Sequence, residues 1–187
     1  MLPSHTFTAT TEDALWQQVA ADIRRDPDLF EYSAELVQDH LPVRLDIDID
    51  LGGGFESGFA STSFTAPVPA SVPLRFALHE QDWLHEVGKL LGLTDVELND
   101  PELDAAFIIT TNDAEALRIL LLDTADVRAT LLRYQECRLT LGPASHAPDA
   151  PLQLVFTKED ALVEPEQLRE VYHMLYALLR RLTGPAA

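Results

Sequence analysis

Apolar and polar residues alternate strictly from position 41 to position 51, and this is the strongest pattern in the chain. The odd positions hold leucine, valine or isoleucine, whereas the even positions hold a proline, an arginine and three aspartates. Successive side chains of a strand point to opposite faces of a sheet, so a period of two predicts a strand with one buried and one polar face. The three aspartates are Asp46, Asp48 and Asp50.

Weaker patterns predict further strands. A glycine-rich connection leads to a second strand around 55–65, and "VPLRFALHE" at 72–80 alternates again. Three strands joined by short connections favour an antiparallel meander with one covered face. Four shorter strands are predicted at 95–100, 106–111, 137–141 and 152–156.

Two segments at the ends of the chain have the 3.6-residue period of amphipathic helices. The first is expected over 10–26, where Thr10 and Asp13 form a candidate capping box. The last begins at Pro165, which suits the first helical position, and stops at Gly184. The apolar face of the first helix consists of Leu15, Trp16, Val19, Ala20 and Ile23.

The helices between these two are shorter or less certain in position. Residues 26–40 are ambiguous, and a short helix over 34–39 is one interpretation. A helix is predicted over 82–92, another is expected where Asn112 serves as a cap, and a third follows Asp123. Strands in two groups, with helices between and after them, favour an α+β fold. We expect one α+β domain over residues 1–187, with an antiparallel sheet packed by the N-terminal, middle and C-terminal helices.

The charge of the chain limits its partners. Thirteen basic and thirty-one acidic residues give a formal net charge of −18. Affinity for nucleic acid and for anionic lipid comes mainly from lysine and arginine, so the composition excludes nucleic-acid and membrane-surface binding as expected functions. It favours solubility and fast encounter with a basic protein partner. The alternative is that the acidity is only an adaptation to salt.

Other features of composition narrow the protein class. The single cysteine, Cys137, excludes an internal disulfide and a zinc cluster of thiolates, and its strand-like neighbours favour a buried structural thiol. The N-terminal residues lack a basic patch followed by an apolar run, so no signal peptide is predicted. No apolar run reaches the length needed to cross a bilayer. We therefore expect a cytoplasmic protein.

The three aspartates resemble part of a calcium loop, but the spacing is wrong. Counted from Asp46, the glycine position holds Leu51 and the bidentate glutamate position holds Ser57. Alternate residues of a strand lie about 7 Å apart, so one cation could not contact all three carboxylates. We interpret Asp46, Asp48 and Asp50 as a solvated sheet face and keep them only as low-ranking site candidates.

A second set of candidates lies in "HEQDWLHE". His79 and His85 are six residues apart across an expected strand-to-helix junction, whereas a zinc helix needs histidines four apart. Asp82 is more simply a helix N-cap. If His79, Asp82 and His85 converged on a cavity, they could serve a small-molecule binder or a modest hydrolase.

Acidic residues also gather in "ELNDPELD", where a turn explains them at least as well as acid–base chemistry does. The stretch "NDPELDAAFIITTNDAEALRILL", residues 99–121, resembles a D-P-E-(F/L)-D-x-x-F block found in an uncharacterised bacterial family of unknown function. The resemblance covers the second half of the chain. Members often carry membrane helices ahead of this domain, and the family implies no agreed activity. Its matching residues are interpreted as turn, core and cap positions: Asp100, Pro101, Leu103, Phe107 and Asp113.

These observations favour a non-enzymatic, acidic protein-binding domain of the chaperone or immunity type, with no metal and no cofactor. The enzyme question stays open, because a pocket at His79, Asp82 and His85 is the alternative. The sequence does not indicate an oligomeric state.

Overall fold

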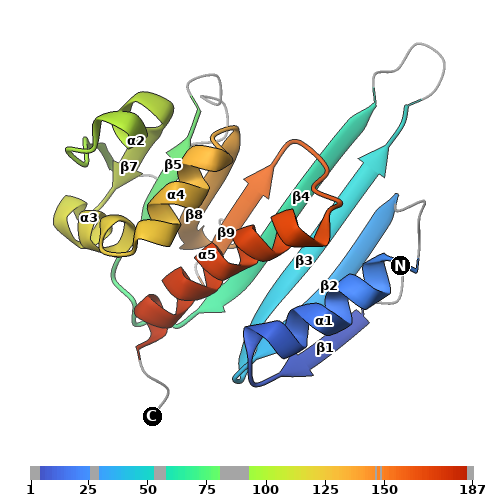
Figure 1. Cartoon of the computed structure of the whole chain (residues 1–187). Coiled ribbons are helices and arrows are strands. Elements are labelled where there is room, and N and C mark those ends of the chain that lie inside the picture. Colours follow the sequence, from blue (N-terminus) through green and yellow to red (C-terminus); the bar gives the residue numbers. More distant parts are fainter. Residues whose placement is uncertain are drawn as a thin grey trace. The chain divides into compact units, whose positions relative to one another are not determined.

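The computed structural model describes residues 5–25, 30–52, 58–80, 93–145, 147 and 149–184, and it confirms the α+β prediction. These residues form a mostly antiparallel sheet with the strand order β1-β2-β3-β4-β9-β8-β5-β7-β6 (Figure 1). The strands are β1 (His5–Ala9), β2 (Glu31–Gln38), β3 (Leu41–Asp50), β4 (Phe59–Val68), β5 (Phe76–His79), β6 (Thr94–Asp95), β7 (Ile108–Thr111), β8 (Cys137–Pro143) and β9 (Leu152–Lys158). The helices are α1 (Glu12–Ile23), α2 (Pro101–Ala106), α3 (Ala114–Leu122), α4 (Ala125–Arg133) and α5 (Pro165–Thr183).

The chain divides into two compact units. Unit 1 comprises Met1–Ala66 and Thr157–His173, and unit 2 comprises Pro67–Phe156 and Met174–Ala187. Helix α5 therefore contributes its first part to unit 1 and its second part to unit 2. The expectation of one domain stays a prediction.

The sheet of unit 1 is built on a tight hairpin between β2 and β3. The two strands are antiparallel, with Gln38 paired to Leu41, so only Asp39 and His40 make the turn. Both turn residues have positive φ, 45° and 68°, which matches the right-handed twist of the strands in a two-residue hairpin. Asp and His enter this region more readily than most residues other than glycine. β4 adds antiparallel to β3, and β1 adds parallel to β2.

The prediction of a short helix over 34–39 is wrong. Residues Glu31–Gln38 form β2, in which the buried positions alternate: Tyr32, Ala34, Leu36 and Gln38. The ambiguous segment has glutamate and alanine, which suit a helix, but pairing with the strongly alternating β3 gives every second residue a buried contact. Strand β1 was not predicted at all, because five residues with two exposed threonines carry little hydrophobic signal.

Two helical segments cover one face of the unit 1 sheet. α1 and the first part of α5 lie on the same side of β1–β4 (Figure 1). Trp16 of α1 contacts Tyr172 of α5 edge to face, with ring centroids 5.5 Å apart. The Tyr172 hydroxyl donates a buried hydrogen bond to Gln38 Oε1 at 3.0 Å, which satisfies a polar pair inside this core. The strands supply Val43, Leu45, Ile47, Phe64 and Ala66 to the same core.

Unit 2 places β5 between β7 and β8. Phe76 pairs with Thr111 on one side and with Leu141 on the other, both antiparallel. The expected meander therefore includes β3 and β4 but not β5, and the strand at 72–80 is shortened to Phe76–His79. The segment expected as a turn contains α2, whose N-cap is Asp100. The Asp100 side chain accepts hydrogen bonds from the backbone N–H groups of Glu102 and Leu103. The helix predicted at 82–92 lies outside the described residues.

Three expected helix caps are displaced by one residue. Thr11, not Thr10, caps α1 by accepting from the Ala14 N–H, and Asp113, not Asn112, caps α3 by accepting from the Ala116 N–H. Thr124 precedes α4. Asn112 instead accepts from the Arg75 N–H and donates to the Pro73 carbonyl. The expected stop of α5 is confirmed, since Gly184 follows it with φ of 75°.

Replacement of Thr62 by valine tests a buried polar contact inside unit 1. The Thr62 hydroxyl donates to the Asp160 carbonyl at 2.9 Å and accepts from the Leu162 N–H at 2.8 Å. Thr62→Val keeps the shape but leaves both backbone groups without a partner, so we expect a loss of about 1–3 kcal/mol of unfolding free energy in urea. Thr65→Val, on the other face of the same strand, should change it by less than about 0.5 kcal/mol. Equal losses would contradict this assignment.

Candidate functional site

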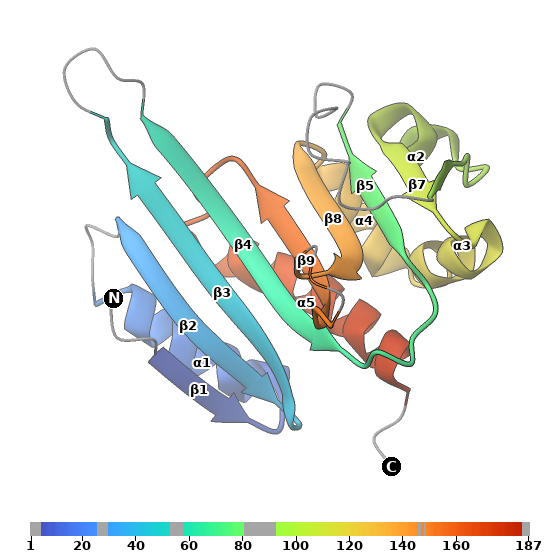
Figure 2. The same cartoon turned by 180° about the vertical axis from the view of Figure 1, so that it is seen from behind.

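Unit 1 leaves one face of its sheet free of described helices, as the view from behind shows (Figure 2). We call this surface the open face and define it by the side chains that alternate with the core of β2, β3 and β4. Residues that are paired across neighbouring strands share a face, so these side chains form rows across the three strands. The rows are Glu31–Asp48–Ser61, Ser33–Asp46–Ser63 and Glu35–Arg44–Thr65. The polar strand face expected from the sequence is therefore continued by serine and threonine on β4.

The open face carries excess negative charge. Arg44 donates from Nε and Nη2 to the two oxygens of Asp46 at 2.7 and 2.9 Å, and from Nη2 to the Ser33 hydroxyl at 3.2 Å. The hydrogen bonds to Asp46 raise the pKa of Arg44, and the negative charges of Asp46 and Glu35 add to this effect. Glu31 and Asp48, by contrast, lie directly opposite each other across β2 and β3. Like charges in that position repel each other and destabilise the strand pairing.

The three aspartate candidates do not form a group. Asp46 and Asp48 project from the open face, and Asp46 is held by Arg44. Asp50 lies at the end of β3, where its side chain accepts from the Gly52 N–H at 2.9 Å and so organises the chain after the strand. Within the described part of the chain, no three histidine, cysteine, aspartate or glutamate side chains are grouped as a metal site needs.

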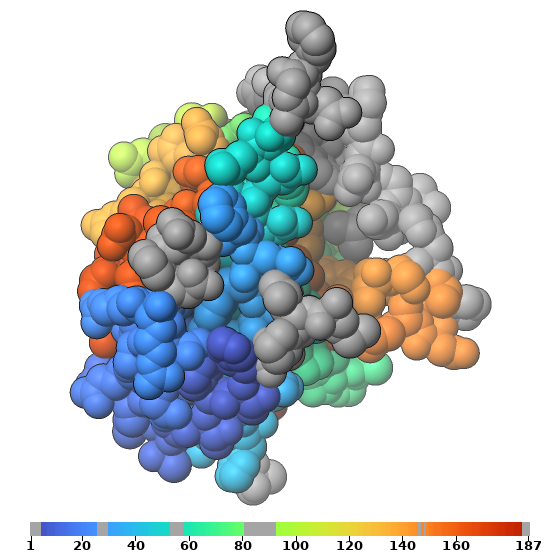
Figure 3. Space-filling model, turned by 90° about the vertical axis from the view of Figure 1, so that its right-hand side faces the viewer, coloured from blue at the N-terminus to red at the C-terminus, as the bar shows by residue number. Residues whose placement is uncertain are grey.

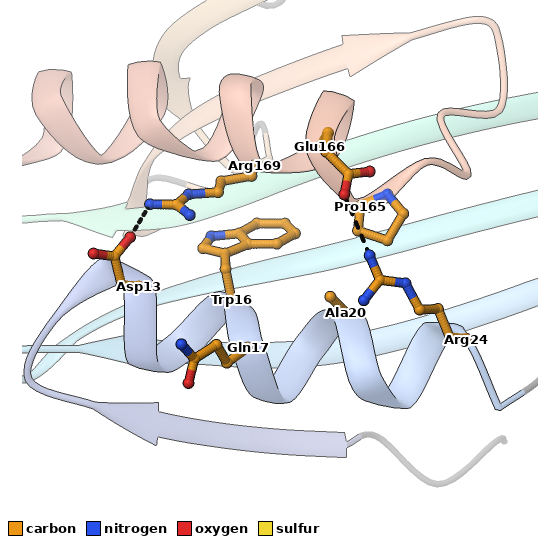
Figure 4. A pocket seen from close by; sticks show the side chains of 8 residues that line it. All are labelled: Asp13, Trp16, Gln17, Ala20, Arg24, Pro165, Glu166 and Arg169. Atoms are coloured by element: carbon orange, nitrogen blue, oxygen red, sulfur yellow. Dashed lines mark hydrogen bonds and ion pairs between the residues drawn. The ribbon is translucent and has the colours of Figure 1, made fainter.

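A groove of about 340 Å³ lies between α1 and the start of α5 in unit 1 (Figure 4). Trp16 forms its base and is only 3% exposed. An ion pair crosses at each end: Arg169 donates to Glu12 and Asp13, and Arg24 Nη2 donates to Glu166 at 3.3 Å. The lining residues are Asp13, Trp16, Gln17, Ala20, Arg24, Pro165, Glu166 and Arg169.

Two ion pairs of this groove, Arg169 with Asp13 and Arg24 with Glu166, are largely in solvent. The side chains of Asp13 and Glu166 are 77% and 74% exposed, so each pair stabilises the helix contact by at most about 1 kcal/mol. The buried Trp16 Nε1 finds no hydrogen-bond acceptor in the part of the chain that the structure describes. Sequence reasoning missed this groove, because its two walls come from segments about 150 residues apart and neither wall contains a recognisable motif.

His79 is the one member of the second candidate set that the structure describes. It is buried at the end of β5, and its Nδ1 lies 2.8 Å from the Glu80 carbonyl oxygen. A carbonyl oxygen only accepts, so Nδ1 is the donor in this contact. His79 Nε2 and the Thr110 hydroxyl are both buried and have no hydrogen-bond partner among the described residues, and they come from adjacent strands on one sheet face. Asp82 and His85 lie outside the described residues, so the small-molecule hypothesis stays a prediction.

The acidic residues at 97–104 stabilise the local structure of unit 2 through hydrogen bonds. Asp104 accepts from the N–H groups of Leu98 and Asp100, and Asp100 caps α2. Arg128 of α4 donates to Asp100 from Nε and Nη2, and also to Glu102. The hydrogen bonds from Arg128 hold the pKa of Asp100 below its usual value. The structural interpretation of the resembling block agrees with this geometry: Leu103 and Phe107 are buried, and Asp113 is a cap.

No family model, no curated protein and no solved structure matches the chain. The resemblance of residues 99–121 therefore stays a prediction. No helix in the described ranges is both long enough and apolar enough to span a membrane.

Variants of Asp100 separate its cap from its ion pair. Asp100→Ala removes both and should lower the unfolding free energy by at least about 1 kcal/mol, the usual cost of a lost N-cap. Asp100→Asn keeps the cap and loses only the charge that faces Arg128. Because the folded pKa of Asp100 lies below the unfolded one, its ionic contribution is present above the unfolded pKa of about 4 and disappears as pH falls through the folded pKa.

The stability advantage of the natural protein over Asp100→Asn should therefore be largest near neutral pH and shrink below pH 4. Urea unfolding followed by circular dichroism at pH 7 and pH 3 measures both values. A difference that does not change with pH would show that Arg128 adds nothing through the charge of Asp100.

Proposed function

We propose that this protein binds a basic protein partner through the open face of unit 1. The observation that carries the proposal is the register of β2, β3 and β4, which gathers Glu31, Glu35 and Asp48 on a sheet face that no described helix of unit 1 covers. A polar face on which carboxylates outnumber the one arginine, Arg44, is costly for the isolated domain. A partner that brings lysine or arginine would relieve that repulsion.

The net charge of −18 supports the same partner chemistry at longer range. Charge of one sign accelerates encounter with a molecule of opposite sign and suppresses association with acidic molecules. A chaperone of a basic protein and an inhibitor of a basic toxin both fit this description. Salt adaptation is the rival explanation, and it predicts no dependence on which acidic residues are present.

Neutralisation of the open face tests the proposal against that rival. The triple variant Glu31→Gln, Glu35→Gln and Asp48→Asn changes the net charge from −18 to −15. A matched variant with the same change is built from exposed residues of unit 2, Asp95→Asn, Glu97→Gln and Asp149→Asn. Removal of three charges at the contact should weaken binding by about tenfold or more, since each exposed pair contributes up to about 1 kcal/mol.

Tagged natural protein and both variants are used to capture partners from native lysate at low and then high salt, with mass spectrometry as the readout. We expect one stoichiometric partner with the natural protein and the unit 2 variant, and its loss with the open-face variant or with rising salt. Equal capture by the two variants, or no partner at either salt, would contradict the proposal.

A further inference from the structure

Strand β1 forms one edge of the sheet, and the described residues place no strand on its outer side. The space-filling view from this side shows β1 and β2 at the surface, in dark and lighter blue (Figure 3). An edge strand presents a row of backbone N–H and C=O groups that another chain can pair with. Such edges are a recurrent docking surface for extended peptides.

The outward groups of β1 can be identified from one hydrogen bond. The Ala9 carbonyl accepts from the Asp39 N–H at 3.2 Å, so the backbone N–H and C=O of Ala9 point toward β2. Along a parallel strand, every second residue bonds to the same neighbour. The backbone groups of His5 and Phe7 therefore also point toward β2, and those of Thr6 and Thr8 point outward. Both threonines are exposed.

The outer edge is partly capped already. Gln18 Nε2 of α1 donates to the Thr8 carbonyl at 3.3 Å, while it also donates to the Ala14 carbonyl of its own helix. The N–H and C=O of Thr6 and the N–H of Thr8 have no hydrogen bond to any described residue. Three backbone groups are therefore open for pairing, and a fourth is held only by an exposed side chain.

The chemistry beside this edge selects the occupant. Thr6 is in register with Glu35, so the edge and the open face meet there. A segment added to β1 would lie two strand spacings, about 9.5 Å, from β2, and a lysine side chain of about 6 Å can lean over the small Thr6 toward Glu35. A second copy of this chain would instead bring two surfaces of strongly negative charge together.

We propose that an extended segment of the partner, bearing lysine or arginine, pairs with the outer edge of β1 and places its basic side chains over Glu35 and the adjoining open face. This inference rests on the proposed function and specifies its mode of contact. The backbone pairing supplies affinity and position, whereas the charges supply selectivity for a basic sequence.

The probe is a labelled nine-residue peptide of alternating lysine and valine, with binding followed by fluorescence anisotropy. A second peptide has the same sequence but carries N-methyl groups on all its internal amides, so it keeps the charge and neither of its edges can donate to a backbone ladder. Thr6→Pro is the decisive variant. It removes an outward N–H without removing a bond to β2, and proline is tolerated at such edge positions. Thermal melting checks that the variant keeps its fold.

We expect Thr6→Pro to weaken binding of the first peptide by about tenfold, because one hydrogen bond is lost and the proline ring blocks close approach. Gln18→Ala should tighten binding by about threefold, since it frees the Thr8 carbonyl at an exposed helix position where alanine is well tolerated. The methylated peptide should bind the natural protein as weakly as the first peptide binds Thr6→Pro.

The possible failures are distinguishable. If both peptides bind the natural protein and Thr6→Pro equally, but not the open-face triple variant, the edge pairing is overturned and the proposed function survives. If the open-face triple variant binds both peptides as tightly as the natural protein does, the proposed function fails, and the inference that rests on it fails with it. A dimer of the natural protein in sedimentation that Thr6→Pro removes would assign the edge to a second copy and overturn the chosen occupant.

Discussion

The pairing register of β2, β3 and β4 is the constraint on which unit 1 depends. Ala34, Leu45 and Phe64 form one row across the three strands and are all buried, while the adjacent row is serine, aspartate and serine. A slip of one residue would turn every aliphatic side chain toward solvent and every carboxylate toward α1. The covered core and the acidic open face are consequences of this one register.

The same register creates a cost that unit 1 only partly offsets. Arg44 neutralises Asp46 through a two-pronged hydrogen bond, but Glu31 and Asp48 meet across the strands. A surface selected only for solubility could separate these carboxylates at no structural expense. The charges on the covered side are treated differently, since Arg169, Arg24 and the acidic residues around them are matched across α1 and α5. This contrast is why the open face, rather than the groove above Trp16, supports our proposal of a basic partner.

Candidate residues could be predicted only where the chemistry is local. The alternating aspartates were recognised, and so was their solvated side, because strand periodicity is written in eleven consecutive residues. Asp100, Leu103, Phe107 and Asp113 were interpreted as structural for the same local reason. The helix over 34–39 was wrong because propensity was judged without the partner strand, and β1 was missed because an edge strand needs little apolar sequence. The groove and the pairing of Glu31 with Asp48 depend on segments that sequence alone cannot align.

The sequence by itself determined the α+β class, the amphipathic terminal helices, the two faces of β3 and a formal net charge of −18. Each follows from composition or from a short period in consecutive residues. Tertiary structure decided which strands are neighbours, that β5 lies between β7 and β8, and that β1 joins β2 in parallel with Thr6 and Thr8 outward. Those features are set by contacts between residues far apart in the chain, where a single register outweighs many local preferences.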